Sequence, residues 1–99
     1  VLVLATPVYF YSMDGQLKTL IDRTLPRYTE IRDKEVYFIA TAAAGKGAME
    51  RTIDALRGFT DCLPGAQVKG VICGSGVYQK GEVLGTQAFQ DAYRADLRA

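Results

Sequence analysis

The chain has 99 residues, of which 48% are hydrophobic and 23% are charged, and its formal net charge is +1. This length fits one domain or part of one, and the composition is that of a globular protein, which excludes a disordered chain. The balanced charge provides no basic stripe for nucleic acid or for an anionic membrane. No apolar run in the sequence approaches the roughly 20 residues that a membrane span needs.

The chain has no histidine, and its two cysteines are Cys62 and Cys73. The lack of histidine excludes histidine-based triads, histidine–zinc sites and imidazole general bases. Two cysteines without Cys-x-x-Cys spacing form neither a disulfide framework nor a zinc site, so we expect reduced thiols in a cytoplasmic protein. We predict no catalytic side chain and no metal site, and any chemistry must use a cofactor, backbone groups, carboxylates or tyrosines.

The first predicted unit is an apolar strand over about 1–5, a loop rich in proline and aromatic residues, and a helix over about 14–25. Ser12 or Asp14 can cap the helix, and Pro26 ends it. The helical spacing predicts one apolar face formed by Leu17, Leu20, Ile21, Thr24 and Leu25.

Two further units follow the same plan. A strand over 35–41 leads through a small-residue loop over 42–47 to a helix over about 48–59, with Met49, Ile53 and Leu56 facing inward. A strand over 67–73 leads through a loop over 74–81 to a helix over about 86–98, with Phe89, Ala92, Tyr93 and Leu97 on one face. This alternation predicts an α/β fold with a parallel sheet.

The first and third strands are almost wholly apolar, as expected for strands covered on both faces. With the strands in sequential order, right-handed crossovers place the first two helices on one face and allow the last helix to return to the other. One edge of the first strand would then lie bare. Either the chain dimerises through that edge or further strands precede Val1, which stands at full strand hydrophobicity without an initiator Met.

Several segments resemble the flavodoxin-like NADPH-dependent FMN reductase family, including its iron–sulfur flavoprotein branch. The more specific match is Thr6-Pro7-Val8-Tyr9-Phe10 followed by Gly15-Gln16-Leu17-Lys18 and Leu20-Ile21-Asp22-Arg23-Thr24. The weaker matches are Thr41 with the loop to Gly47, Pro64-Gly65-Ala66, Gly76-Val77-Tyr78 and Gly81-Glu82-Val83. Together they cover essentially the whole chain.

The resemblance implies a flavodoxin-like five-stranded parallel sheet in the order 2-1-3-4-5, with helices on both faces and FMN at the carboxyl ends of the strands. Residues 1–99 would be the C-terminal portion of this single domain and supply strands three to five. The family's first strand with its phosphate loop, its second strand, and the cysteine cluster of the iron–sulfur branch have no counterpart in this sequence.

The resemblance also implies an oxidoreductase that passes a hydride from NADPH or NADH through flavin N5 to an acceptor, and a homodimer or homotetramer. The cofactor-binding candidates lie in two loops: Thr6, Pro7, Val8, Tyr9, Phe10, Tyr11, Ser12, Met13, Thr41, Ala42, Ala43, Gly45 and Gly47. The first loop can present backbone N–H groups to the flavin while Tyr9, Phe10 and Met13 cover its faces. The second can bring backbone amides to the pyrimidine O2.

Alternatives remain for both loops and for the function. The aromatic residues of the first loop can simply pack on the next helix, and the second loop can be a plain strand-to-helix turn. Gly45-Lys46-Gly47 lacks the P-loop pattern, and Gly74-Ser75-Gly76 is a weak match to a dinucleotide fingerprint. The chain can instead be a non-catalytic half-domain that associates with another chain and does not bind FMN alone, or an unrelated α/β binding domain.

Overall fold

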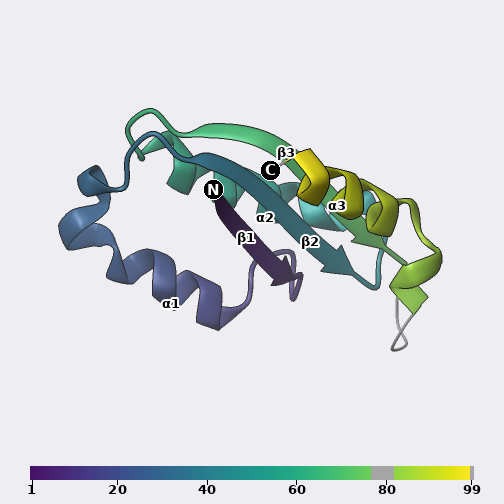
Figure 1. Cartoon of the computed structure of the whole chain (residues 1–99). Helices are drawn as coiled ribbons and strands as arrows, with labels where there is room; N and C mark the ends of the chain where they lie inside the picture. The colour runs from purple at the N-terminus through teal and green to yellow at the C-terminus, as the bar shows by residue number, and fades with distance from the viewer. Residues whose placement is uncertain (77–81, 99) are drawn as a thin grey trace.

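The computed structural model describes residues 1–76 and 82–98. Within them, three strands pair in parallel in the order β1-β2-β3: β1 (Leu2–Pro7), β2 (Glu35–Ala42) and β3 (Gln67–Ser75). The α-helices are α1 (Gly15–Arg23), α2 (Glu50–Asp61) and α3 (Gln87–Arg98), and each follows its strand (Figure 1). Short 3-10 helices lie at η1 (Leu25–Glu30), η2 (Lys46–Met49) and η3 (Glu82–Gly85). The predicted α/β fold with a parallel sheet is confirmed.

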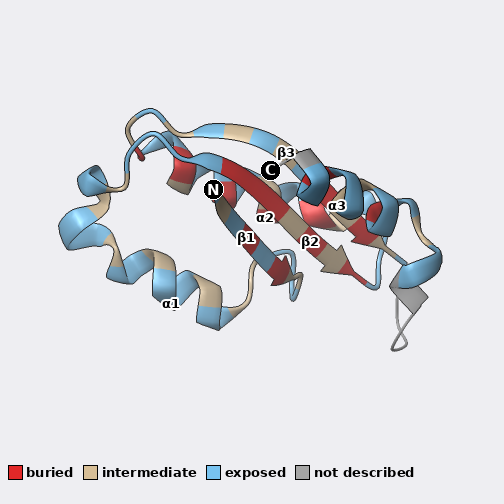
Figure 2. Cartoon of the chain, in the orientation of Figure 1, coloured by how far each residue is buried: buried red, intermediate tan, exposed pale blue. Residues whose placement is uncertain are grey.

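The helices cover the two faces of the sheet as the crossover rule predicts. On one face, Leu4, Val36 and Phe38 from the sheet pack with Leu56 of α2, and Leu17 and Ile21 of α1 contact the same cluster. On the other face, Tyr37 and Ile72 pack against Ala88 and Ala95 of α3. Both faces of the central strand β2 are therefore covered, and it carries a long buried run (Figure 2).

The prediction that the first strand is covered on both faces is wrong for the described residues. Leu4 and Thr6 of β1 are buried, but Val3 is 53% exposed and Ala5 is also exposed. The cause is the position of α3, whose buried alanines contact β2 and β3. The face of β1 that carries Val3 therefore stays open, together with the outer edge of this strand.

The first helix is shorter and less buried than predicted. Its side-chain cap is Asp14, whose Oδ1 accepts a 2.8 Å hydrogen bond from the Leu17 amide. It ends at Arg23, and Pro26 lies in η1 instead. The predicted apolar face is wrong at Leu20 and Leu25, which are 61% and 71% exposed, because only the ridge of Leu17 and Ile21 reaches the core and Leu25 falls beyond the helix.

The second helix agrees with its predicted inward face. Met49 and Leu56 are buried, and Ile53 is half-buried and contacts the clusters around both of them. Its α-helical part begins at Glu50, two residues later than predicted, because η2 occupies the residues before it. Strand β2 agrees with its prediction and extends one residue further, to Ala42.

The predicted face of the last helix is wrong at every residue except Ala92. Ala88, Ala92 and Ala95 face the sheet, whereas Phe89, Tyr93 and Leu97 are exposed. A close approach explains the preference for alanine, since the bulky Tyr37 and Ile72 already fill the space above the sheet. The larger side chains of α3 lie on a neighbouring face of the helix that no described element covers.

Gly70 in β3 makes room for the side chain of Tyr37, on the face of the sheet that α3 covers. A Cβ at Gly70 would lie 2.9 Å from Cδ1 of Tyr37, which is closer than real Cβ contacts allow. The β2–β3 pairing also shifts register between Val36 and Tyr37. Strand β3 continues through Gly74 and Ser75, which were predicted as loop, and the rest of that loop (77–81), with Tyr78, lies outside the described residues.

Candidate functional site

The loop after β1 is closed by a threonine hydroxyl. Thr6 is buried, and its Oγ1 accepts a 3.0 Å hydrogen bond from the backbone amide of Asp14 and donates one of 2.7 Å to the carbonyl of Pro7. Asp14 in turn caps α1. The hydroxyl of Thr6, a predicted cofactor-binding residue, is thus used to join the end of the strand to the beginning of the helix.

The tip of this loop is a tight turn built from aromatic residues. The amide of Tyr9 donates to the carbonyl of Ser12 at 3.0 Å, and the amide of Ser12 donates back to Tyr9 at 3.1 Å. Between them, Phe10 has φ +51° and Tyr11 has φ +65°. Positive φ at both central residues is typical of a two-residue type I′ turn, which usually contains Asn and Gly.

The turn is costly for these residue types. A left-handed backbone costs roughly 1–2 kcal/mol for a residue with a Cβ, and two such residues occur in succession. The turn also leaves the Phe10 side chain 100% exposed. Backbone outliers with exposed aromatic side chains are a known indication of a binding site, so the turn supports a functional interpretation of this loop.

A backbone hydrogen bond joins the two predicted loops. The amide of Val8 donates to the carbonyl of Thr41 at 2.8 Å, one residue beyond the paired residues Pro7 and Thr41. The loop over 8–13 and the loop over 43–45 therefore lie side by side at the carboxyl edge of β1 and β2. The two groups of candidate residues, distant in sequence, are brought to one place.

The predicted residues differ in what their side chains do. Val8 packs with Ala40, Ala42 and Met49, and Met13 contacts the core cluster around Leu4. The side chains of Val8, Ala42 and Met13 are therefore engaged in packing. The side chains of Tyr9, Phe10, Tyr11, Ser12 and Ala43 are exposed at the carboxyl edge, and so are the backbones of Gly45 and Gly47.

Three backbone amides of the first loop have no acceptor. Within residues 1–76 and 82–98, the N–H groups of Phe10, Tyr11 and Met13 donate no hydrogen bond, whereas those of Val8, Tyr9, Ser12 and Asp14 do. Donors without an internal partner at a strand end can bind acceptor atoms of a ligand. The sequence predicted amide donors in this loop, and the structure shows which of them are free.

The structure adds a residue that the sequence analysis missed. The guanidinium carbon of Arg51, in the first turn of α2, lies 5.2 Å from the centroid of the Tyr11 ring. A sequence signal existed, because a basic residue opposes the helix dipole at a helix N-terminus, where acidic residues are favoured. Arg51 therefore links the second helix to the aromatic turn.

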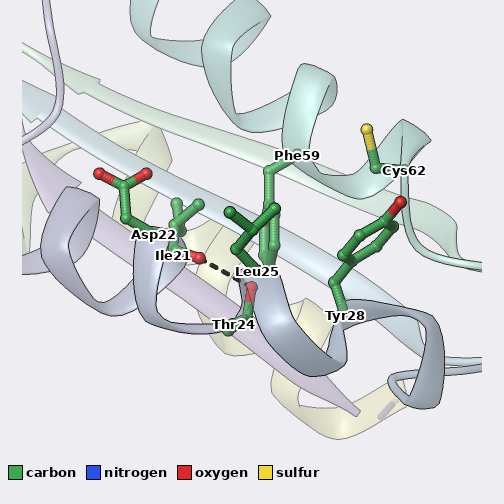
Figure 3. A pocket seen from close by; sticks show the side chains of 7 residues that line it. All are labelled: Ile21, Asp22, Thr24, Leu25, Tyr28, Phe59 and Cys62. Atoms are coloured by element: carbon green, nitrogen blue, oxygen red, sulfur yellow. Dashed lines mark hydrogen bonds between the residues drawn. The ribbon is translucent and has the colours of Figure 1, made fainter.

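Two cavities among the described residues lie away from the aromatic turn. A cavity of about 340 Å³ lies between η1 and the end of α2, and Phe59 and Leu25 point into it beside Tyr28 and Cys62 (Figure 3). These segments precede β2 and β3, so this cavity is at the amino edge of the sheet, opposite the two loops. Another, of about 330 Å³, lies between α2 and β3 and is lined in part by Lys46 and Cys73. Neither cavity contains the predicted aromatic residues.

The described part of the chain holds neither a metal-binding cluster nor a membrane-spanning helix. It contains no group of three or more cysteine or acidic side chains placed to hold a metal ion. None of its helices has the length and apolar character of a membrane span. Cys62, which is exposed, and Cys73, which is half-buried, are both free thiols.

Comparison with known proteins supports the fold. The solved structure of the Trp repressor binding protein from Bacillus subtilis is similar to the chain, with a TM-score of 0.77 and 26% sequence identity. The match covers 93% of this chain and 66% of that one, so the chain spans just under two thirds of that structure. Among curated proteins, no sequence matches the chain significantly.

A family assignment comes from the sequence itself. The sequence model of the NADPH-dependent FMN reductases matches residues 1–79. This range includes both loops, the turn at Phe10 and Tyr11, and all three strands. The three parallel strands with helices on both faces are those of a flavodoxin-like fold. The chain belongs to the NADPH-dependent FMN reductase family.

Proposed function

We propose that the protein is an FMN-dependent NAD(P)H oxidoreductase of the flavin or quinone reductase type. In this proposal the flavin ring lies at the carboxyl edge of β1 and β2, against residues 8–13 and 41–47. The observation that carries it is the aromatic turn with its three free amides, within a segment matched by the family. In open parallel sheets, ligands bind at this edge.

The loop over 8–13 fits the edge of a flat, polar-rimmed ring. The free N–H groups of Phe10, Tyr11 and Met13 suit its carbonyl and ring-nitrogen acceptors. The exposed rings of Tyr9, Phe10 and Tyr11 can cover its faces by stacking. Because the hydrogen bonds of Thr6 and Val8 already hold the loop, little order has to be gained on binding.

The loop over 43–45 suits the neighbouring edge of the ring. Ala43, Ala44 and Gly45 are exposed and carry no side chain larger than a methyl group, so a ligand can approach their backbone closely. The hydrogen bond between Val8 and Thr41 fixes the distance between the two loops. The sequence predictions for Thr41, Ala42, Ala43, Gly45 and Gly47 remain part of this proposal.

The chemistry belongs to the cofactor. FMN held by residues 8–13 and 41–47 would supply hydride chemistry at its N5, with NADPH or NADH as the reductant. The residues of this chain would bind and orient the ring, exclude water from its faces and tune it through hydrogen bonds. A hydride step needs no side-chain acid, which agrees with a chain that has no histidine.

The test is FMN binding by the protein expressed from its own gene. We expect one-to-one quenching of FMN fluorescence and FMN-dependent oxidation of NADPH. Replacing Phe10 and Tyr11 by Gly-Gly relieves the backbone cost but removes both rings, so we expect a stable protein with weaker FMN binding. A Leu20→Lys variant, altered on exposed α1, is the matched control and should bind normally. A protein that shows no quenching at millimolar FMN would refute the proposal.

A second candidate has its own support. The chain can be a half-domain that associates with another polypeptide, a homodimer or homotetramer included, and binds no FMN alone. The open edge of β1, the exposed Val3 and a cavity of about 230 Å³ between Val3 and Ala92 of α3 form an apolar surface with Phe89 and Tyr93 beside it. Such surfaces usually mark an interface. The free cysteines suit a reducing compartment, so we place either form in the cytoplasm.

The two candidates separate in one experiment. Light scattering gives the mass in solution, and FMN titration of the same sample gives the stoichiometry. Association with one FMN per chain supports the oxidoreductase, and association without FMN binding supports the half-domain.

A further inference from the structure

We propose that Arg51 is a positioning residue for the flavin site. It holds the turn at Phe10 and Tyr11 in its left-handed conformation by placing its guanidinium over the Tyr11 ring. The inference rests on the proposed function for the ligand, but the contact with Tyr11 can be tested without it.

The contact crosses between two elements. Arg51 lies in the first turn of α2, and Tyr11 lies in the loop after β1, forty residues earlier in the chain. The guanidinium carbon is 5.2 Å from the ring centroid, within the range of an attractive cation–π contact. Arginine is well suited to this task because its flat guanidinium stacks on aromatic faces.

The turn needs support beyond its own hydrogen bonds. Phe10 and Tyr11 both have positive φ, and the side chain of Phe10 makes no protective contact, since it is fully exposed. The hydrogen bonds of Thr6 and Val8 secure the two ends of the loop and not its tip. Among the described residues, Arg51 makes a cation–π contact with a ring at the tip, that of Tyr11.

The charge of Arg51 is available for this contact. The ion pairs of the described chain join Lys18 to Asp22 and Arg27 to Glu30, and neither involves Arg51. Its place at a helix N-terminus opposes the helix dipole and gives no local benefit. A guanidinium that is neither neutralised by a carboxylate nor favoured by its helix is explained by its contact with Tyr11.

Holding Tyr11 has a direct consequence for the ligand. The amides of Phe10, Tyr11 and Met13 are the free donors of the loop, and two of them belong to the turn itself. A fixed ring at Tyr11 fixes the direction of these donors before the ligand arrives. Such preorganisation raises affinity by lowering the ordering cost of binding.

The same helix provides a matched control. Arg57 lies six residues further along α2, with its guanidinium carbon 5.8 Å from the centroid of the Phe38 ring. Phe38 is a buried residue of β2 and takes no part in the loop. An Arg57→Gln variant therefore removes the same kind of contact from the same helix at a distance from the site.

The first measurement uses the flavin-free protein expressed from its own gene. Chymotrypsin cleaves after Tyr9, Phe10 and Tyr11, and cleavage reports local opening of the loop. We expect Arg51→Gln to raise the cleavage rate in this loop about two- to fivefold, the range of one exposed cation–π contact. Arg51→Lys should restore part of the protection, and Arg57→Gln should leave the rate unchanged.

The second measurement adds FMN. Arg51→Gln should weaken FMN binding by a similar factor, with partial rescue in Arg51→Lys. In a Tyr11→Leu background, Arg51→Gln should have no further effect, because its partner is gone.

The outcomes are distinct. Two results would overturn the role of Arg51 in holding the turn. One is an unchanged cleavage rate in Arg51→Gln. The other is an equal change in cleavage rate or FMN affinity whether Arg51→Gln is made with Tyr11 present or in the Tyr11→Leu background. Increased cleavage with normal FMN affinity would overturn its role in the site. If the wild-type protein binds no FMN, the proposed function fails, and cleavage alone decides whether Arg51 holds the turn.

Discussion

Thr6 Oγ1 accepts a 3.0 Å hydrogen bond from the amide of Asp14, eight residues further along the chain. This single bond joins the end of β1 to Asp14, the N-cap residue of α1, and the aromatic turn lies between them. The geometry of the candidate site therefore depends on a buried hydroxyl.

Removing this hydroxyl should loosen the loop and destabilise the fold. A Thr6→Val variant keeps the shape of the side chain but leaves the Asp14 amide without its acceptor, which costs about 1–3 kcal/mol. We expect the free energy of unfolding in urea to fall by this amount. Thr6→Ser keeps the hydroxyl and should lose much less, and equal losses in the two variants would show that the hydrogen bond contributes nothing.

The hydroxyl of Thr52, on α2, should destabilise the protein, in contrast to that of Thr6. The Thr52 hydroxyl is fully buried and has no hydrogen-bond partner in the described structure. A Thr52→Val variant removes an unsatisfied polar group at nearly constant volume, so we expect stability to rise by up to about 1 kcal/mol.

The control for Thr52 is Thr60, on the same helix. Thr60 is also buried, but its Oγ1 donates to the carbonyl of Arg57 at 3.1 Å. Thr60→Val should therefore lose stability relative to Thr52→Val. Thermal unfolding of the two variants, compared with wild type, checks the order, and the reverse order would contradict this account of the hydroxyls.

Replacing Gly70 and Gly58 by alanine should change the stability of the protein in opposite directions. Gly70→Ala forces its Cβ against the Tyr37 ring and should cost about 1–3 kcal/mol. Gly58 is exposed in the middle of α2 with nothing near its Cβ position, so Gly58→Ala should add about 0.5–1 kcal/mol through helix propensity. Urea unfolding measures both, and a stabilised Gly70→Ala would show that Tyr37 moves aside freely.

The apolar surface at β1 should control association. A Val3→Lys variant places a charge beside the cavity lined by Ala92 and Ala95. We expect it to lower the mass seen by light scattering if this surface is an interface. Leu20→Lys, on the opposite face, is the control, and equal behaviour of the two variants would argue against an interface at Val3.

The sequence predicted the parts of the fold that depend on local pattern. Strand β2 and the inward residues of α2 follow directly from their periodicity, and Asp14 was one of two predicted caps for α1. Periodicity failed at α3, because Phe89, Tyr93 and Leu97 satisfy the same spacing as the alanines that are actually buried. The bulk of Tyr37 and Ile72 on the sheet determines which face of α3 is buried. The sequence of the helix carries no information about these two side chains.

The candidate site shows the same limit. The two loops were predicted from their residue types and a family resemblance, and the structure joins them through Val8 and Thr41. The left-handed turn at Phe10 and Tyr11 could not be predicted, because neither residue type favours positive φ. The contact between Arg51 and Tyr11 is of the same kind, since it joins residues from two units of the fold.

The central claim is that a flavin ring binds at the loops after β1 and β2. Its most direct test is titration of FMN into the isotope-labelled protein expressed from its own gene, followed through the backbone amide signals. We expect saturable shifts centred on Phe10, Tyr11 and Met13 and extending to residues 41–47, with none at the cavity of Tyr28 and Cys62. Shifts centred on that cavity, or an absence of shifts at millimolar FMN, would contradict it.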